Sequence, residues 1–167
     1  MKWTSNEIAL LGVAATLIVT IVAALSAYLA SKRERRRTLY TEAVQAIVGW
    51  KEMLYRVRRR TKDDEAGLVG AFHELQDKMA YYQAWIAMDS KHMSRSYARL
   101  VVKIKGATTD LIWQAWDEPI RPAPGKARPE EMHPDIDQFV QAFADDCRSH
   151  LSPLPWRKLA LVLRNRS

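Results

Sequence analysis

The sequence has few of the residues on which disulfide-linked, β-rich or phosphate-binding proteins depend. Of its 167 residues, one is cysteine, Cys147, and six are glycine. A single thiol excludes an internal disulfide framework and fits a reducing compartment. The shortage of glycine argues against many tight β-turns and against a glycine-rich phosphate loop.

The side chains that usually form catalytic or metal sites are also missing in the required spacing. None of the histidines lies one helical turn from another or beside a cysteine pair; they are His73, His92, His133 and His150. The adjacent acids Glu130-Glu131 and Asp145-Asp146 would point about 100° apart on a helix, which does not make an acid–base pair. We therefore expect no enzyme activity, no metal site and no cofactor.

One long apolar run stands near the N-terminus. Residues 8–30 form 23 consecutive positions without a charge, and a helix needs about 20 residues to cross the hydrocarbon core of a bilayer. A signal peptide would place its charge before a shorter apolar stretch, whereas here the charge follows. The pattern predicts a transmembrane helix over residues 8–30, with residues 1–7 as a short extracytoplasmic N-terminus.

A basic run follows the span directly and predicts its orientation. Residues 31–38 contain one acid, Glu34, and five cations, Lys32, Arg33, Arg35, Arg36 and Arg37. Because positive charge stays on the cytoplasmic side, the N-terminus is expected outside and the rest of the chain in the cytoplasm. The same cations could meet anionic phospholipid.

Small residues share one face of the expected span. They are Gly12, Thr16, Thr20, Ala23 and Ala27. Such a stripe lets another membrane helix approach closely. It predicts packing against a second copy or a partner helix, although small residues are common in membrane helices in any case.

The remaining chain shows the apolar spacing of helices. Apolar residues recur every three or four positions over about 39–60, 64–88, 91–117 and 134–151. In chain order these stripes are Tyr40, Ala43, Ile47, Trp50, Leu54 and Val57; Leu68, Phe72, Leu75, Met79, Tyr82 and Ile86; Met93, Tyr97, Leu100, Ile104, Ala107 and Leu111; and Ile136, Val140, Phe143 and Cys147. Residues 119–134 hold five prolines and predict an exposed loop. The fold class is predicted to be all-α: one N-terminal transmembrane helix followed by a cytoplasmic antiparallel bundle of three to four helices, with coiled-coil-like spacing. Three helices fill residues 39–118 and a fourth fills 135–151. The first can be a direct continuation of the membrane helix.

Several tryptophans exceed what one apolar stripe for each helix requires. Trp85 extends one face of the second stretch, and Trp113 and Trp116 extend the third. They either pack across the bundle or form an interface, because aromatic residues favour buried interface centres.

The tail, residues 152–167, is basic and amphipathic. Trp156, Leu159 and Leu163 can share one face, and the cations around it are Arg157, Lys158 and Arg164. A short helix of this type either lies in the lipid headgroup region or packs against the bundle or a partner. It is too short to span a membrane.

The overall charge favours anionic partners but does not identify one. Lys and Arg total 26 against 19 Asp and Glu, a net charge of +7. Nucleic acid is disfavoured because zinc-finger spacing and RNP-type aromatic motifs are absent from the sequence. The cluster from Arg56 to Lys62 is expected to be a solvated helix end.

The layout resembles that of small bacterial membrane proteins with one N-terminal span, a basic stop and a helical cytoplasmic domain. The matching stretches are residues 8–37 and, more loosely, 139–151. The resemblance implies a bacterial plasma membrane. The leading hypothesis is a non-enzymatic, single-pass membrane-anchored helical interaction module that acts by self-assembly or partner binding at the cytoplasmic face. The alternatives are a membrane-acting effector, such as a phage-exclusion or defence protein, and a membrane-tethered nucleic-acid binder.

Overall fold

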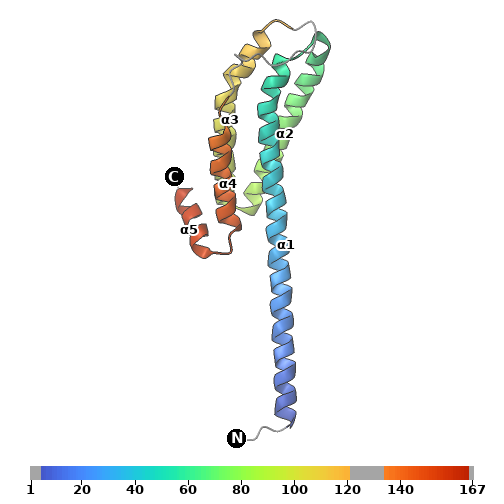
Figure 1. The fold of residues 1–167 in the computed structure, drawn as a ribbon, viewed down its shortest axis with the longest axis vertical. Helices are drawn as coiled ribbons and strands as arrows, with labels where there is room; N and C mark the ends of the chain where they lie inside the picture. The colour runs from blue at the N-terminus through green and yellow to red at the C-terminus, as the bar shows by residue number, and fades with distance from the viewer. Residues whose placement is uncertain (1–4, 121–133, 166–167) are drawn as a thin grey trace. The chain divides into compact units, whose positions relative to one another are not determined.

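The structure, a computed structural model, describes residues 5–120 and 134–165, with side chains from residue 12 onward. Within these ranges it is helical and contains no strand: α1 (Ser5–Arg58), α2 (Glu65–Asp89), α3 (Lys91–Asp117), α4 (Asp137–Leu151) and α5 (Pro155–Arg164), with a 3₁₀ turn at Lys62–Asp64 (Figure 1). The prediction of an all-α chain is confirmed for these residues. Most of the predicted proline-rich loop, residues 121–133, lies outside the described residues, as do residues 1–4 and 166–167. The chain forms two compact units, Met1–Arg37 and Thr38–Ser167.

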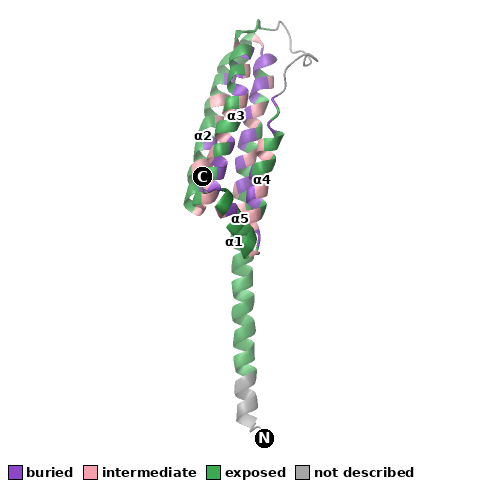
Figure 2. Ribbon diagram, turned by 90° about the vertical axis from the view of Figure 1, so that its left-hand side faces the viewer, coloured by how far each residue is buried: buried purple, intermediate pink, exposed green. Residues whose placement is uncertain are grey.

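The N-terminal unit consists of the first part of α1, which continues through Ser31 without a break. All the described side chains from Gly12 to Arg35 are exposed (Figure 2). None of these side chains is covered by the rest of the chain, unlike those of a helix in a protein core. In the described part of the chain, this helix is the one segment long and apolar enough to cross a membrane.

The hydroxyl groups in this segment are satisfied within the helix itself. Thr16 donates to the carbonyl of Gly12 at 2.9 Å, and Thr20 donates to the carbonyl of Thr16 at 2.8 Å. Ser26 donates to the carbonyl of Val22 at 2.7 Å. These three aliphatic hydroxyls therefore present no unpaired donor to an apolar surrounding, as expected for Thr and Ser in a membrane helix.

The second unit, residues Thr38–Ser167, is called the helical unit below. Its helices share one buried core, to which the last five turns of α1 contribute a stripe. Every apolar position predicted for this stripe is buried, namely Tyr40, Ala43, Ile47, Trp50, Leu54 and Val57. The stripe is buried because α1 here lies against α2 on one side and α3 and α4 on the other (Figure 1).

Helix α2 packs on the core through the predicted spacing. Leu68, Met79 and Ile86 are buried, and the other three residues of the predicted stripe, Phe72, Leu75 and Tyr82, are half-buried. A close approach to α1 occurs at Gly49, where a Cβ would lie 3.0 Å from Cδ2 of Leu75. The missing side chain of Gly49 therefore lets the two helices approach at this level.

Helix α3 departs from its predicted stripe in its second half. Met93, Tyr97, Leu100 and Ile104 are buried as expected, but the sequence also predicted Ala107 and Leu111, which are only half-buried. The fully buried positions are instead Thr108, Ile112 and Ala115. At this level the indole of Trp50 donates to the hydroxyl of Thr108, which places Thr108 rather than Ala107 on the inner face. The prediction for Ala107 and Leu111 was therefore wrong by one position.

Parts of α1, α2 and α4 meet at the end of the helical unit that contains its first residue, Thr38. The hydroxyl of Tyr40 donates to Oδ2 of Asp89 at 3.1 Å, at the end of α2. The ring of Tyr40 also lies 6.0 Å from the ring of His150, at the end of α4. This junction joins α1, the α2–α3 turn and the α4–α5 connection. Ser90 follows α2 and caps α3 by accepting from the Met93 N–H at 3.4 Å.

Candidate functional site

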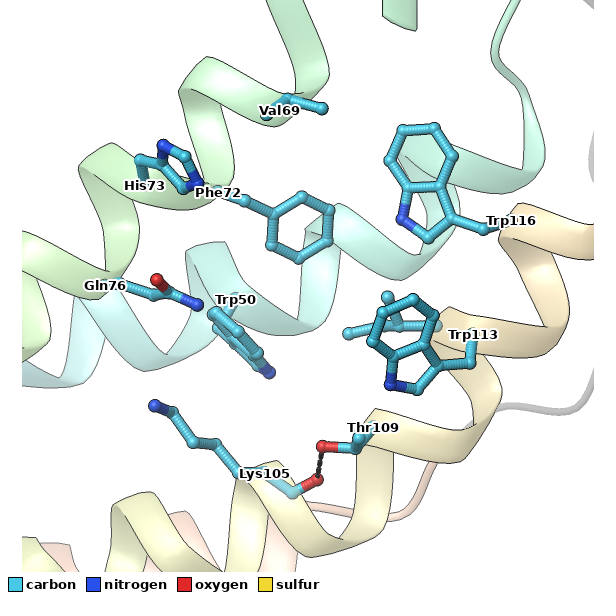
Figure 3. Close-up of a pocket in the computed structure, with 10 residues that line it drawn as sticks. Trp50, Val69, Phe72, His73, Gln76, Lys105, Thr109, Trp113 and Trp116 are labelled. Atoms are coloured by element: carbon cyan, nitrogen blue, oxygen red, sulfur yellow. Dashed lines mark hydrogen bonds between the residues drawn. The ribbon is translucent and has the colours of Figure 1, made fainter.

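A groove lined by aromatic side chains opens in the helical unit between α2 and α3 (Figure 3). Its volume is about 600 Å³, within the range of ligand-binding clefts. Ten side chains line it: Trp50 from α1; Val69, Phe72, His73 and Gln76 from α2; and Lys105, Thr109, Ile112, Trp113 and Trp116 from α3. It therefore draws on three helices that are distant in the sequence.

The base of the groove is fixed by Trp50. This ring is buried and packs edge-on against Phe72, with centroids 5.4 Å apart and planes at 80°. Its indole N–H donates to the hydroxyl of Thr108 at 2.9 Å, and that hydroxyl donates to the carbonyl of Ile104 at 2.8 Å. Because both polar groups are satisfied, the base is rigid and its remaining surface is apolar.

The α3 side of the groove is formed by two tryptophans one turn apart. Trp116 is half-buried, and the guanidinium of Arg60 lies 5.0 Å from its ring centroid. Trp113 is 66% exposed. Leaving so much indole surface in water forgoes the energy that burial of a Trp normally contributes. Trp113 is thus the groove residue with the most to gain from a bound partner.

Polar groups lie at the edge of the groove. Nζ of Lys105 sits 5.4 Å from the centroid of Trp50. His73 and Gln76 stand on the α2 side, and Thr109 donates to the carbonyl of Lys105 at 2.6 Å on the α3 side (Figure 3). Such an arrangement, apolar inside and polar at its edge, suits binding of large apolar side chains. Among the residues the structure describes, no group of three or more His, Cys, Asp or Glu could hold a metal ion.

The structure separates the three tryptophans that the sequence singled out as an interface. Trp113 and Trp116 both line the groove. Trp85 does not; it is 47% exposed elsewhere on α2 and its ring lies 6.1 Å from that of Tyr81. Sequence reasoning placed Trp50 and Phe72 in the packing stripes and missed that they also face a groove. The spacing of apolar residues shows which side of a helix is inward, but not where neighbouring helices leave space.

The basic cluster at the end of α1 is only partly the solvated helix end that the sequence suggested: Arg56, Arg59 and Lys62 are exposed. Arg58 and Arg60 are buried, at 7% and 4% exposure. The guanidinium of Arg60 donates to the carbonyls of Ala115 at 2.6 Å and Trp116 at 2.7 Å, in the last turn of α3. It thereby satisfies acceptors that the end of a helix leaves without partners. The expectation was wrong for these two residues; for Arg60 it ignored the neighbouring terminus of α3.

The residues predicted to act in or near a membrane fall in two places. The small-residue stripe and the cations from Lys32 to Arg37 all lie on α1 in the N-terminal unit. A Cβ added at Gly12 would meet nothing within 4 Å, so the stripe is open at that point. The tail residues from Trp156 to Arg164 form α5 of the helical unit. Helix packing and lipid contact at these positions remain predictions.

Cys147 belongs to the core of the helical unit. It is 9% exposed and lies among the apolar residues that α4 contributes. Burial, together with the nearby carboxylate of Asp146, raises the pKa of the Cys147 thiol to about 12. A thiol that stays protonated at neutral pH is a poor nucleophile, and it acts here as a small apolar side chain.

Comparisons of the chain with protein-family models, with curated proteins and with solved structures find no match.

Proposed function

We propose that the chain is a non-enzymatic, membrane-anchored interaction module whose aromatic groove binds an apolar segment of a partner protein. The observation that carries the proposal is the exposure of Trp113 beside a preformed base of Trp50 and Phe72. Tryptophans in such settings contribute disproportionately to protein–protein affinity. The base needs little reordering on binding, which lowers the entropic cost.

The groove favours a segment that carries acidic residues next to large apolar ones. Lys105 lies at its edge, and the chain as a whole has a net charge of +7. An acid on the partner would pair with Lys105 while apolar side chains fill the space against Trp50 and Trp113. Charge complementarity of this kind raises the association rate and selects among partners.

The anchor in this proposal is the apolar part of α1, crossing the plasma (inner) membrane of a bacterium once. Its uncharged, exposed surface supports this, and so does the basic run from Lys32 to Arg37 that follows it. By the distribution of positive charge, the N-terminus lies outside and the helical unit in the cytoplasm. Self-assembly through the stripe that contains Gly12 and Thr16 would bring two grooves to one partner.

Nucleic acid is disfavoured as the partner because two arginines of the basic cluster at the end of α1 are buried. Arg58 and Arg60 are buried, and the guanidinium of Arg60 is occupied by backbone carbonyls. These two cations are therefore removed from the surface that phosphate contacts would need.

The test compares two exposed residues of α3. Trp113→Ala removes the exposed wall of the groove, and Val102→Ala truncates a residue that is 69% exposed and does not line it. Each full-length variant is cross-linked in cells and purified in a mild detergent, and the copurifying chains are identified by mass spectrometry. Both should melt like the wild type, because surface truncations change stability by at most about 0.5 kcal/mol.

The expected result is a stoichiometric partner with the wild type and with Val102→Ala, and a loss of about tenfold or more with Trp113→Ala. Equal recovery from both variants would show that the groove does not hold the partner. Recovery of the chain with only a second copy of itself would replace partner binding by self-assembly.

A further inference from the structure

Helix α5 has two faces, and the one against the rest of the helical unit is not the one that its apolar pattern suggests. Leu161 is 1% exposed and Asn165 is fully buried. Trp156, Leu159 and Leu163 are instead 62%, 60% and 58% exposed. At 100° per residue these three fall within about one sixth of the helix circumference. Single exposed leucines are ordinary, but three large apolar side chains on one stripe of a ten-residue helix form a patch.

The patch is presented by a helix that is held in place. Asp146 of α4 receives the guanidinium of Arg164, and its Oδ2 accepts from the Ser96 hydroxyl at 2.5 Å. The carbonyl of Asn165 accepts from Arg95 of α3 at 3.0 Å. Ser96 and Asp146 are themselves buried. The packed face is therefore tied to both α3 and α4, and α5 cannot roll to cover its exposed stripe without breaking these bonds.

The charge on α5 is of one sign. Over residues 155–165 the helix and its cap contain Arg157, Lys158 and Arg164 and no acid. Arg157 and Lys158 are exposed in the first turns, beside Trp156. An apolar stripe flanked by cations, with a tryptophan at one end, is the composition of helices that lie in the headgroup region of an anionic bilayer.

The place of α5 in the chain is compatible with contact between its exposed apolar stripe and a membrane. It begins four residues after Leu151, the last residue of α4, next to the junction of Tyr40, Asp89 and His150. Tyr40 follows the end of the expected span, Ala30, by only ten residues. Only a short stretch of chain therefore separates the expected span from the first residues of the helical unit.

We propose that α5 lies on the anionic surface of the membrane that α1 enters, with Trp156, Leu159 and Leu163 in the headgroup region. This rests on α1 being the membrane anchor, as proposed above. A second copy fits the patch less well, because it would bring Arg157 and Lys158 of the two copies together. The contact makes α5 a second attachment point, which limits the orientations in which the groove is offered to its partner.

The first experiment measures the depth of position 159 in a bilayer. Full-length chain with Cys147→Ala receives a spin label through Leu159→Cys, and a matched chain receives it through Val102→Cys. Both are reconstituted into vesicles of phosphatidylcholine with or without phosphatidylglycerol. Collision rates with oxygen, which concentrates in lipid, are compared with those of a water-soluble nickel complex. Flotation with the vesicles is checked first and reports on the anchor independently.

With phosphatidylglycerol present, the oxygen-to-nickel ratio at position 159 should be about tenfold above that at position 102. A water-like ratio at position 159 in chains that float with the vesicles would overturn the proposal while leaving the anchor intact. Failure to float would instead refute the anchor. Spin–spin broadening at position 159 that disappears on dilution with unlabelled chain would assign the patch to a second copy.

A second measurement leaves Cys147 unchanged. Lipids brominated near the headgroup quench tryptophans at the surface of the bilayer. The quenched fraction of wild-type fluorescence should exceed that of Trp156→Phe, because the substitution removes a quenched ring. Equal fractions in the two proteins would contradict the placement of Trp156 in lipid.

Discussion

Replacement of Arg60 by methionine tests a buried guanidinium that donates to four backbone carbonyls. The Arg60 guanidinium donates to the carbonyls of Val57 at 3.1 Å, Ala115 at 2.6 Å, Trp116 at 2.7 Å and Glu118 at 2.9 Å. Methionine keeps an unbranched apolar stem but removes every donor. The substitution leaves the C-terminal carbonyls of α3 without their partner and removes the cation beside the Trp116 ring.

The expected cost follows from these four bonds. Hydrogen bonds to a charged group contribute about 1.5–3 kcal/mol each, but they are not additive, and carbonyls at a helix end can regain water. We therefore expect Arg60→Met to lower the free energy of unfolding by about 3 kcal/mol. For a unit of this size that corresponds to a fall in melting temperature of about 10 °C.

Thermal unfolding of the full chain in a mild detergent, followed by circular dichroism in the helical band, measures this change. Arg59→Met is the matched control, because Arg59 is the exposed neighbour and its loss should change stability by at most about 0.5 kcal/mol. Arg60→Lys keeps the charge without the planar fork and should fall between the two. If Arg60→Met melts at the same temperature as Arg59→Met, the assigned role of Arg60 is wrong.

Three further predictions concern the groove base, the thiol and the α5 attachment. Trp50→Phe deletes the indole donor to Thr108 in a buried site and should cost about 1–3 kcal/mol in urea unfolding. Cys147 should react with a soluble disulfide reagent about 1000-fold more slowly at pH 8 than in the unfolded chain, because its pKa of about 12 leaves little thiolate. The raised pKa also means that stability falls as pH rises above about 9, where the unfolded thiol ionises first. Asp146→Ala removes the acceptor of Arg164 and should make α5 susceptible to limited proteolysis before the rest of the helical unit unfolds.

The sequence was sufficient for the helices because their limits have local causes. Ser90 supplies a cap, and the prolines after Leu151 cannot continue α4. The apolar spacing in α1 also predicted its buried face, since a helix has only one way to place residues three and four apart on the same side. The apolar span could also be predicted from the sequence, because its length and its lack of charge do not depend on contacts with other helices.

Features that depend on two or more helices could not be predicted in this way. Thr108 is buried because the indole of Trp50 and a backbone carbonyl satisfy its hydroxyl, which an apolar pattern counts as a surface residue. Asn165 is buried for a similar reason, in contact with Asp146 and the carbonyl of Leu161. Its burial directs α5 inward through the face opposite to Trp156. The groove also arises from the spacing between helices, which no single stretch of sequence contains.

Photochemical cross-linking from inside the groove tests the central claim most directly. A photoreactive amino acid replaces Thr109, whose side chain lines the groove, and a second chain carries it at Val102 outside the groove. After irradiation in cells, we expect a discrete adduct with another protein from position 109 and none from position 102. That adduct should weaken when Trp113→Ala is added. Absence of any adduct from position 109, or equal adducts from both positions, would contradict partner binding in the groove.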